Sequence, residues 1–106
     1  MSKTASVTMV RPKIEPRLDV LEPPQYRVIY INDDVTTMEF VIETLMEFFN
    51  YSTQTAVKIT EDIHNDGSAV VAVLPYEVAE QKGIEVTVSA RSQNYPLQIK
   101  LEPENS

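Results

Sequence analysis

The sequence predicts one small α+β domain, because strand-like and helix-like apolar patterns occupy separate segments of it. Residues 26–31 form an apolar run in which alternate side chains would lie on opposite faces of a strand. Residues 37–49 and 53–65 instead repeat apolar side chains at steps of three and four, the period of an amphipathic helix. A chain of 106 residues with 42% hydrophobic content supports one domain with one core.

A cluster of polar residues follows the first strand directly. Asn32, Asp33 and Asp34 crowd amide and carboxylate oxygens, all hydrogen-bond acceptors, at one end of the strand. Asn32 shares a strand face with Tyr30. Such residues before a helix are typical of turn and capping chemistry, but they also suit a binding site if a partner group lies beside them. Both interpretations stay open at this point.

The first helix is predicted to begin at Thr37. Thr36 and Glu39 have the S/T-x-x-E spacing of a capping box, in which the hydroxyl and the carboxylate satisfy free amides at the helix start. The apolar side of this helix is formed by side chains at three- and four-residue steps, namely Met38, Val41, Ile42, Leu45, Phe48 and Phe49.

The second helix carries the only histidine of the chain. His64 follows Thr60 by four residues and Ile63 by one, so the three side chains border one pocket if this helix packs on the first. The simpler interpretation is a residue at a helix C-terminus, shortly before the stop at Gly67.

The C-terminal part of the chain contains one segment whose pattern is ambiguous. Strands are predicted at residues 68–74 and 97–102. Between them, Ile84, Val86 and Val88 alternate with polar residues after Gly83, which by itself predicts another strand.

Several motifs together resemble the ClpS family, the adaptors that hand N-degron substrates to the Clp AAA+ protease. The family run Asn-Asp-Asp-x-Thr-Pro-Met-Glu-Phe-Val is matched by residues 32–41, with threonine at Thr37 in place of proline. Further matches are Pro23-Pro24-Gln25-Tyr26, His64 with Gly67 and Ala69, Glu77-Val78-Ala79-Glu80 with Lys82, and Tyr95-Pro96-Leu97. The resemblance spans about residues 23 to 102 in register.

The resemblance implies an order of elements, βααβαβ, with three helices packed on a three-stranded antiparallel sheet. It therefore favours a helix from about Pro75 to the region of Arg91 over the strand that the alternation predicts, and Val78, Ala79, Val86 and Ala90 can share one face of that helix. The predicted domain is residues 25–106.

The resemblance also implies a site for the free α-amino group of a substrate. An ammonium has three N–H donors and no acceptor, so it needs about three acceptors in a compact arrangement, and Asn32, Asp33 and His64 would supply them. Asp33 also supplies the negative charge that a partly buried cation requires. An acetylated N-terminus, which lacks the charge and two donors, should be rejected.

An apolar socket for the first substrate side chain, which in the family is Leu, Phe, Tyr or Trp, is implied beside these acceptors. Its expected lining is Tyr30, Met38, Val41, Thr60, Ile63 and Leu97, with Asp34 and Thr36 near the entrance. Tyr30 and Thr60 depart from the aliphatic residue and the methionine expected there, so the socket should differ in shape and polarity. Thr37 in place of a proline at the first helical position should reduce rigidity with little change in geometry.

Glu77 and Lys82 match the family positions that contact the N-terminal domain of the partner ATPase, a Clp (Hsp100) AAA+ unfoldase of the ClpA or ClpC type. The alternative for such a pair is a solvated, charged helix face. We expect a monomer that binds this ATPase and N-degron substrate proteins.

Composition and charge exclude several other classes. The leader, residues 1–24, is rich in proline and is expected to be disordered. Its charge is about +1, and because the whole chain has a net charge of −7, the rest of the chain carries about −8. An acidic domain without a basic stripe argues against nucleic acid. With no cysteine, no long apolar run and no signal peptide, the sequence indicates no disulfides, no membrane span and a cytoplasmic location.

Two other functions were weighed against an adaptor. Asp33, Asp34, Glu39 and His64 resemble a metal or acid–base site, but there is no second histidine, no HExxH spacing and no cysteine nucleophile, so we expect neither an enzyme nor a cofactor. A structural interaction domain with a fold like that of the ribosomal stalk protein would share the scaffold and lack the N-degron site.

Overall fold

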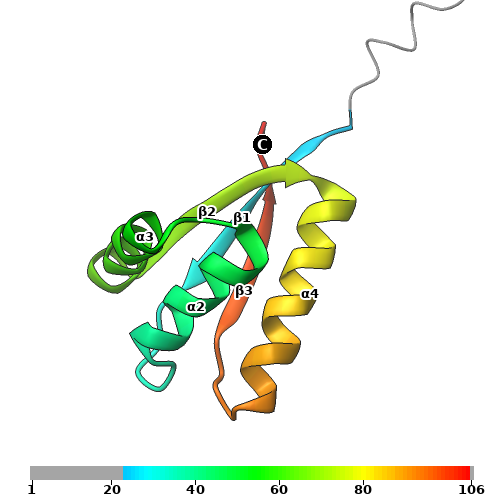
Figure 1. The fold of residues 1–106 in the computed structure, drawn as a ribbon. Coiled ribbons are helices and arrows are strands. Elements are labelled where there is room, and N and C mark those ends of the chain that lie inside the picture. Colours follow the sequence, from blue (N-terminus) through cyan, green and yellow to red (C-terminus); the bar gives the residue numbers. More distant parts are fainter. Residues whose placement is uncertain (1–22, 106) are drawn as a thin grey trace, which may run out of the picture.

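A computed structural model describes residues 23–105, and the elements follow one another in the predicted order βααβαβ (Figure 1). They are β1 (Gln25–Ile31), α2 (Met38–Phe49), α3 (Thr53–Asp66), β2 (Ser68–Pro75), α4 (Tyr76–Ser92) and β3 (Gln98–Pro103). The α+β class is confirmed, and each boundary lies within about two residues of its prediction. The leader predicted to be disordered lies outside the described residues, apart from Pro23 and Pro24.

The three strands form one antiparallel sheet with β1 in the centre, in the order β2-β1-β3. The start of β1 pairs with the end of β2, as Gln25 opposes Pro75, and the end of β1 pairs with the start of β2, as Ile31 opposes Ser68. The register shifts between Val28 and Ile29, so that one extra residue of β2, Val71, bulges there. The Tyr51 hydroxyl donates a hydrogen bond to the Val71 carbonyl and so satisfies an acceptor at the bulge.

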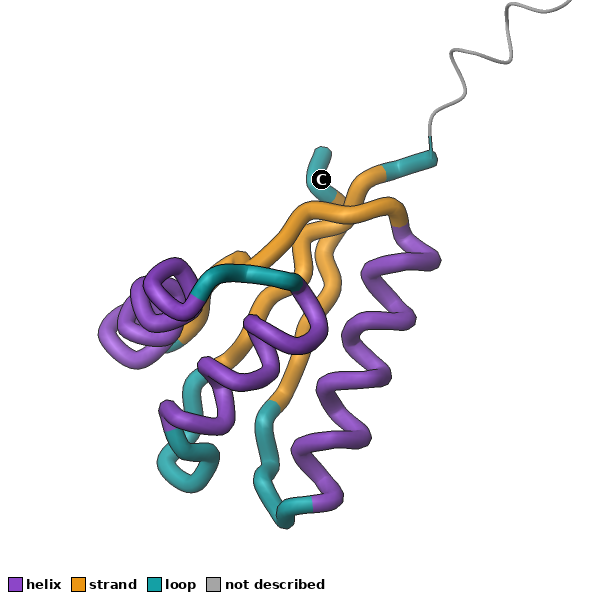
Figure 2. The backbone as a smooth tube through the Cα atoms, viewed as in Figure 1, coloured by secondary structure: helices purple, strands orange, loops and turns teal. Residues whose placement is uncertain are grey.

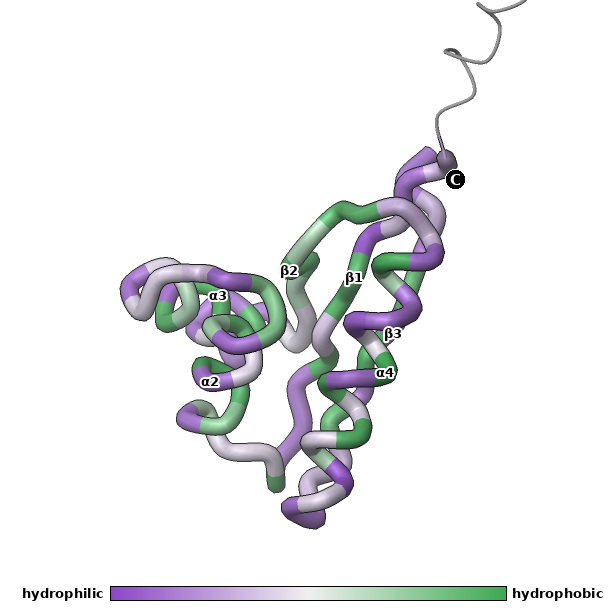
Figure 3. The backbone as a smooth tube through the Cα atoms, turned by 45° about the vertical axis from the view of Figure 1, so that its right-hand side comes forward, coloured by the Kyte–Doolittle hydropathy of each residue, from purple (hydrophilic) through white to green (hydrophobic). Residues whose placement is uncertain are grey.

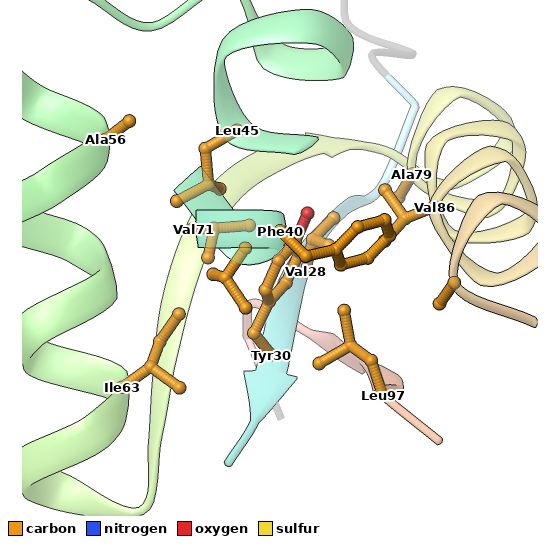
Figure 4. Packing of buried hydrophobic residues seen from close by; sticks show 12 residues of the cluster. Val28, Tyr30, Phe40, Leu45, Ala56, Ile63, Val71, Ala79, Val86 and Leu97 are labelled. Carbon is orange, nitrogen blue, oxygen red and sulfur yellow. The ribbon is translucent and has the colours of Figure 1, made fainter. Parts of the chain in front are cut away.

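The three helices gather over one side of the sheet, with α3 beside β2 and α4 beside β3 (Figures 1 and 2). Val28 and Tyr30 of β1 are fully buried beneath them, whereas Val70 and Val73 of β2 are exposed. Figure 4 shows side chains from all three helices and from the strands converging on Tyr30. The core is made by Val28, Tyr30, Phe40, Val41, Leu45, Ala56, Ile63, Val71, Ala79, Val86, Ala90 and Leu97.

The segment with the ambiguous pattern is helical. Within α4, Ala79, Val86 and Ala90 are fully buried, and seven- and four-residue steps place them on one helical face. Ile84 and Val88 point to solvent, so their alternation with Val86 does not mark a strand. The expectation that Val78 shares the buried face is wrong, because its side chain is 42% exposed. Coloured by hydropathy, α4 accordingly shows hydrophobic and hydrophilic residues interspersed along its whole length (Figure 3).

The predicted capping box at the start of α2 is also wrong. The N-cap is Thr37, whose hydroxyl accepts a hydrogen bond from the amide of Phe40 at 3.1 Å, and the first helical residue is Met38. The Thr36 hydroxyl is used elsewhere, since it donates to Asp33. Thr37 has a φ of −75°, which proline also adopts, so threonine keeps the backbone geometry and adds a capping bond that proline cannot make.

Candidate functional site

A backbone hydrogen bond joins the polar cluster to the end of the helix that carries the histidine. The Asn32 amide donates to the Gly67 carbonyl at 2.9 Å, continuing the pairing of Ile31 with Ser68. Gly67 ends α3 in the left-handed region, with φ +88°, and its own amide donates to Ile63 at 3.0 Å. Asn32 and the last turn of α3 are thereby held side by side, and the exposed His64 belongs to that turn.

Asp33 organises the loop between β1 and α2. Its Oδ1 accepts hydrogen bonds from the amides of Val35 at 2.8 Å and Thr36 at 2.7 Å. Its Oδ2 accepts one from the Thr36 hydroxyl at 2.8 Å. A carboxylate has about four acceptor positions, so this turn leaves about one of them, on Oδ2, for a further donor. The turn chemistry that the sequence suggested is therefore present, and it does not use up the carboxylate.

The same contacts keep Asp33 negatively charged. Partial burial by itself would raise the pKa of this carboxyl, but the hydrogen bonds from the Thr36 and Val35 amides and the Thr36 hydroxyl outweigh it, and the charge of Arg91 adds to them. The net result is a pKa below the usual value of an aspartate. Asp33 thus presents a full negative charge and an acceptor at the end of the sheet.

Most of the side chains expected to line the socket are buried. Tyr30, Val41, Thr60, Ile63 and Leu97 are each at most 6% exposed. Met38, the first residue of α2, is 40% exposed and is the most accessible member of the set. In Figure 4, Ile63 of α3 and Leu97 lie on opposite sides of Tyr30. Thr36 is half-buried and Asp34 exposed in the neighbouring loop, as expected for residues near an entrance.

The two residues that depart from the family pattern have their hydroxyls engaged inside the protein. The Tyr30 hydroxyl is 2.8 Å from Thr44 Oγ1, and the Thr44 hydroxyl in turn donates to the Val41 carbonyl at 2.8 Å. The Thr60 hydroxyl donates to the Ala56 carbonyl of its own helix at 2.7 Å. Burial raises the pKa of Tyr30, so its hydroxyl stays protonated. Both hydroxyls turn toward helix α2 or α3, and the expected difference in the shape and polarity of the socket stays a prediction.

Neither Arg91 nor Tyr95 was assigned a role at the site from the sequence. Arg91 donates from Nη1 to the carbonyls of Tyr95 at 2.8 Å and Leu97 at 2.9 Å, which fixes the connection from α4 to β3. The Tyr95 ring packs on Phe40 with centroids 5.0 Å apart, and its hydroxyl is 3.5 Å from the Thr37 hydroxyl. For Arg91, the sequence offered one signal of this role, because a basic residue in the last turn of a helix often donates hydrogen bonds to nearby carbonyls. Through these contacts Leu97 is held against the core.

Glu77 and Lys82 lie away from this end of the sheet. Glu77 is exposed in the first turn of α4. This helix directly follows Pro75, the residue of β2 that pairs with Gln25 at the start of β1. The seven residues of β1 separate that end from Asn32 by about 20 Å. Lys82 is half-buried and its Nζ lies 3.8 Å from Glu85 Oε1. Five helical residues turn by about 140°, so Glu77 and Lys82 face different directions.

Glu77 borders a hollow at the entry of β1. This hollow has a volume of about 540 Å³ and is lined by Pro23, Pro24, Tyr26, Pro75, Tyr76, Glu77 and Val78. The rings of Tyr26 and Tyr76 meet edge to face, with centroids 4.9 Å apart. Exposed apolar surface and an acidic side chain therefore lie together at the end opposite to Asn32.

Residues 23–105 contain no group of three or more histidine, cysteine and acidic side chains arranged to hold a metal ion. Within the same residues, no helix is long and apolar enough to cross a membrane.

A small α+β domain with hydrogen-bond acceptors and one fixed negative charge at one end of its sheet has the chemistry to bind a cationic group there. The chain belongs to the ClpS family, because the family model described as ATP-dependent Clp protease adaptor protein ClpS matches residues 21–100. The ClpS adapter of Phenylobacterium zucineum is 40% identical over 100 residues, which cover 94% of this chain and 86% of that protein. The ClpS adapter of Caulobacter vibrioides strain NA1000 is 44% identical over 96 residues, covering 91% and 83%.

A solved structure agrees with the family assignment. The structure of Agrobacterium tumefaciens ClpS2 bound to L-phenylalaninamide matches with a TM-score of 0.76 and 37% identity, and the match covers 78% of this chain and 100% of that chain. The relatives are named as adapters of the Clp protease.

Proposed function

We propose that this chain is a non-enzymatic N-degron adaptor. It binds the free α-amino group and the bulky first side chain of substrate proteins, and it delivers them to a Clp AAA+ unfoldase-protease. Asn32, Asp33 and His64 bind the amino group, and the socket of Tyr30, Met38, Val41, Thr60, Ile63 and Leu97 takes the side chain, with Asp34 and Thr36 at its entrance.

The hydrogen bond between the Asn32 amide and the Gly67 carbonyl carries this proposal. It supports a shared site because it holds the polar cluster of β1 beside the turn of α3 that contains His64. The ligand of the Agrobacterium relative, a free amine with a benzyl side chain, has the two features that such a site would recognise. Asp33 supplies the negative charge, and the side-chain carbonyl of Asn32 and the imidazole of His64 supply neutral acceptors.

The expected affinity is micromolar. Each hydrogen bond to the ammonium contributes about 1.5–3 kcal/mol, and burial of a Leu or Phe side chain contributes about 1.5–3 kcal/mol. Three such hydrogen bonds and one buried side chain sum to about 6–12 kcal/mol, and a cost of association of about 4 kcal/mol or more leaves at most about 8 kcal/mol, which corresponds to about 1 μM.

Fluorescence anisotropy with labelled peptides that begin with Leu, Phe, Tyr or Trp tests the amino-group site. We expect saturable binding, and we expect it to be lost when the Leu peptide is N-acetylated, because acetylation removes the charge and two donors. His64→Ala should weaken binding, His64→Gln should retain part of it through the amide oxygen, and Asn65→Ala at the neighbouring exposed position should leave it unchanged. Equal binding of the free and the acetylated peptide would contradict the proposal.

Delivery requires a contact with the ATPase, and we propose that Glu77 and Lys82 make it. The exposed carboxylate of Glu77 beside the hollow around Tyr76 supports a docking role, and its distance from Asn32 leaves the substrate end free. Because Glu77 and Lys82 face different directions, the partner would have to wrap around the outer face of α4.

Charge reversal separates the two functions. Glu77→Lys should weaken binding to the N-terminal domain of the ATPase and leave peptide binding unchanged, whereas Glu47→Lys on the exposed side of α2 should change neither. Titration of each variant with the ATPase domain and with a Leu-initiated peptide measures both. Loss of peptide binding together with ATPase binding in Glu77→Lys would indicate misfolding instead.

A further inference from the structure

We infer that the socket of this chain is short and offers no free hydrogen-bond donor at its inner end, so that it binds Leu and Phe in preference to Tyr and Trp. The inference rests on the proposed function and concerns the ranking of first residues within it. It follows from the position of Tyr30, from the direction of two hydroxyls and from the exposure of Met38.

Tyr30 closes the inner end of the socket. Met38, the most exposed lining residue, begins α2, whereas the Tyr30 hydroxyl reaches Thr44, six residues further along that helix and thus about 9 Å away along its axis. The ring also lies edge to face with Phe49, with centroids 6.3 Å apart. The phenol therefore fills the space between β1 and the second half of α2, where a shorter aliphatic residue would leave room (Figure 4).

The Tyr30 ring is fixed in this position by directed hydrogen bonds. The single hydroxyl hydrogen of Thr44 is donated to the Val41 carbonyl, so Tyr30 must be the donor in its bond to Thr44 Oγ1. Tyr30 and Thr44 are both buried, and turning the ring away would leave buried polar groups without a partner. A substrate side chain cannot easily displace this ring.

The remaining wall is apolar. Thr60 commits its hydroxyl to the Ala56 carbonyl, which directs the oxygen along α3 and leaves its methyl group for packing. Val41, Ile63 and Leu97 are hydrocarbon side chains. A tyrosine hydroxyl that entered the socket would lose its water and find no free hydroxyl hydrogen to accept, because Tyr30 and Thr60 donate theirs to Thr44 and Ala56, which disfavours Tyr relative to Phe.

Met38 is the side chain that must move when a substrate binds. It is 40% exposed, while the other five lining residues are nearly inaccessible. An unbranched thioether with three rotatable bonds can change rotamer without disturbing the backbone. The space that its movement opens is bounded by the Tyr30 ring, which suits Leu or Phe better than the larger indole of Trp.

Dissociation constants for four peptides that differ only in the first residue, Leu, Phe, Tyr or Trp, test this inference. For the unaltered protein, we expect the peptides that begin with Leu and Phe to bind at least about tenfold more tightly than those that begin with Tyr and Trp. Tyr30→Leu should deepen the socket and raise the affinity for Trp relative to Leu by about tenfold. Glu47→Gln, on the exposed side of α2 and outside the socket, is the control and should keep the ranking.

Equal binding of Trp and Leu peptides to the unaltered protein would overturn the inference. So would an unchanged ratio of Trp to Leu affinity in a Tyr30→Leu protein that thermal denaturation shows to be folded. If Tyr30→Leu does not fold, Tyr30→Met makes the same comparison with a longer, flexible side chain that fills more of the space. Binding of none of the four peptides would overturn the proposed function and this inference with it, whereas binding without the expected ranking would overturn the inference alone.

Discussion

Replacing Asp33 with asparagine removes the charge at the proposed amino-group site while preserving the size of the side chain. An asparagine oxygen in place of Oδ1 can still accept from the amides of Val35 and Thr36, 2.8 and 2.7 Å away. Its amide nitrogen, in place of Oδ2, cannot accept from the Thr36 hydroxyl. The variant therefore keeps most of the turn and loses the partner of the ammonium.

The expected magnitudes follow from these contacts. A hydrogen bond to a charged group contributes about 1.5–3 kcal/mol, and we take the lower end because Asp33 is only partly buried, so affinity for a Leu-initiated peptide should fall about tenfold. The hydrogen bond with Thr36 must reverse, so that the amide donates to the hydroxyl, and the bonds from the Val35 and Thr36 amides lose their charged acceptor; together these changes should lower the free energy of unfolding by about 1 kcal/mol. For a domain of this size, that change lowers Tm by about 4–8 °C.

Anisotropy titration at pH 7.5 and thermal denaturation, performed on the same samples, measure both effects. Asp66→Asn is the control, because it removes an exposed carboxylate from the same end of the molecule, at the end of α3. Unchanged peptide affinity in a folded Asp33→Asn protein would refute the reasoning and leave Asp33 as a turn residue only.

Three further predictions concern the elements that hold the site together. Thr37→Ala removes the N-cap of α2 and should lower the free energy of unfolding by about 1 kcal/mol in chemical denaturation, whereas Thr37→Ser should change it little. At Gly67, an added methyl group meets no other atom, but the backbone φ of +88° is strained for alanine, so Gly67→Ala should lower the free energy of unfolding by about 1–2 kcal/mol. It should also weaken peptide binding, because the Gly67 carbonyl accepts the hydrogen bond that holds Asn32. An unchanged stability would mean that the backbone relaxes around the methyl group. Because the pKa of Asp33 is lowered in the folded protein, its contribution to stability is complete above the ordinary aspartate pKa of about 4 and is lost as the pH falls below it. Denaturation between pH 6 and 3 should therefore show a smaller loss of stability for Asp33→Asn than for the unaltered protein, and identical losses would contradict this assignment.

Much of the fold could be predicted because its patterns are local. The apolar alternation of β1 and the three- and four-residue steps of α2 and α3 express which faces of those segments are buried, and each segment was predicted within about two residues. The alternation of Ile84, Val86 and Val88 misled for the same reason. A pattern of three residues fits a strand and also a helix in which only Val86 faces the core, and its neighbours in space decide between them.

The sequence by itself determined the first strand and the two helices after it, the crowding of acceptors at Asn32–Asp34 and the glycine stop after His64, because each depends on residues close together in the chain. Only the tertiary structure decided where the hydroxyls point. Tyr30 binds Thr44 across 14 residues, and Thr37 meets Tyr95 across 58. A hydroxyl is a donor and an acceptor that rotates toward whichever partner the packing brings near, so its direction cannot be read from its neighbours in the chain. In this protein, that direction makes the proposed socket apolar despite the two hydroxyl-bearing residues in its lining.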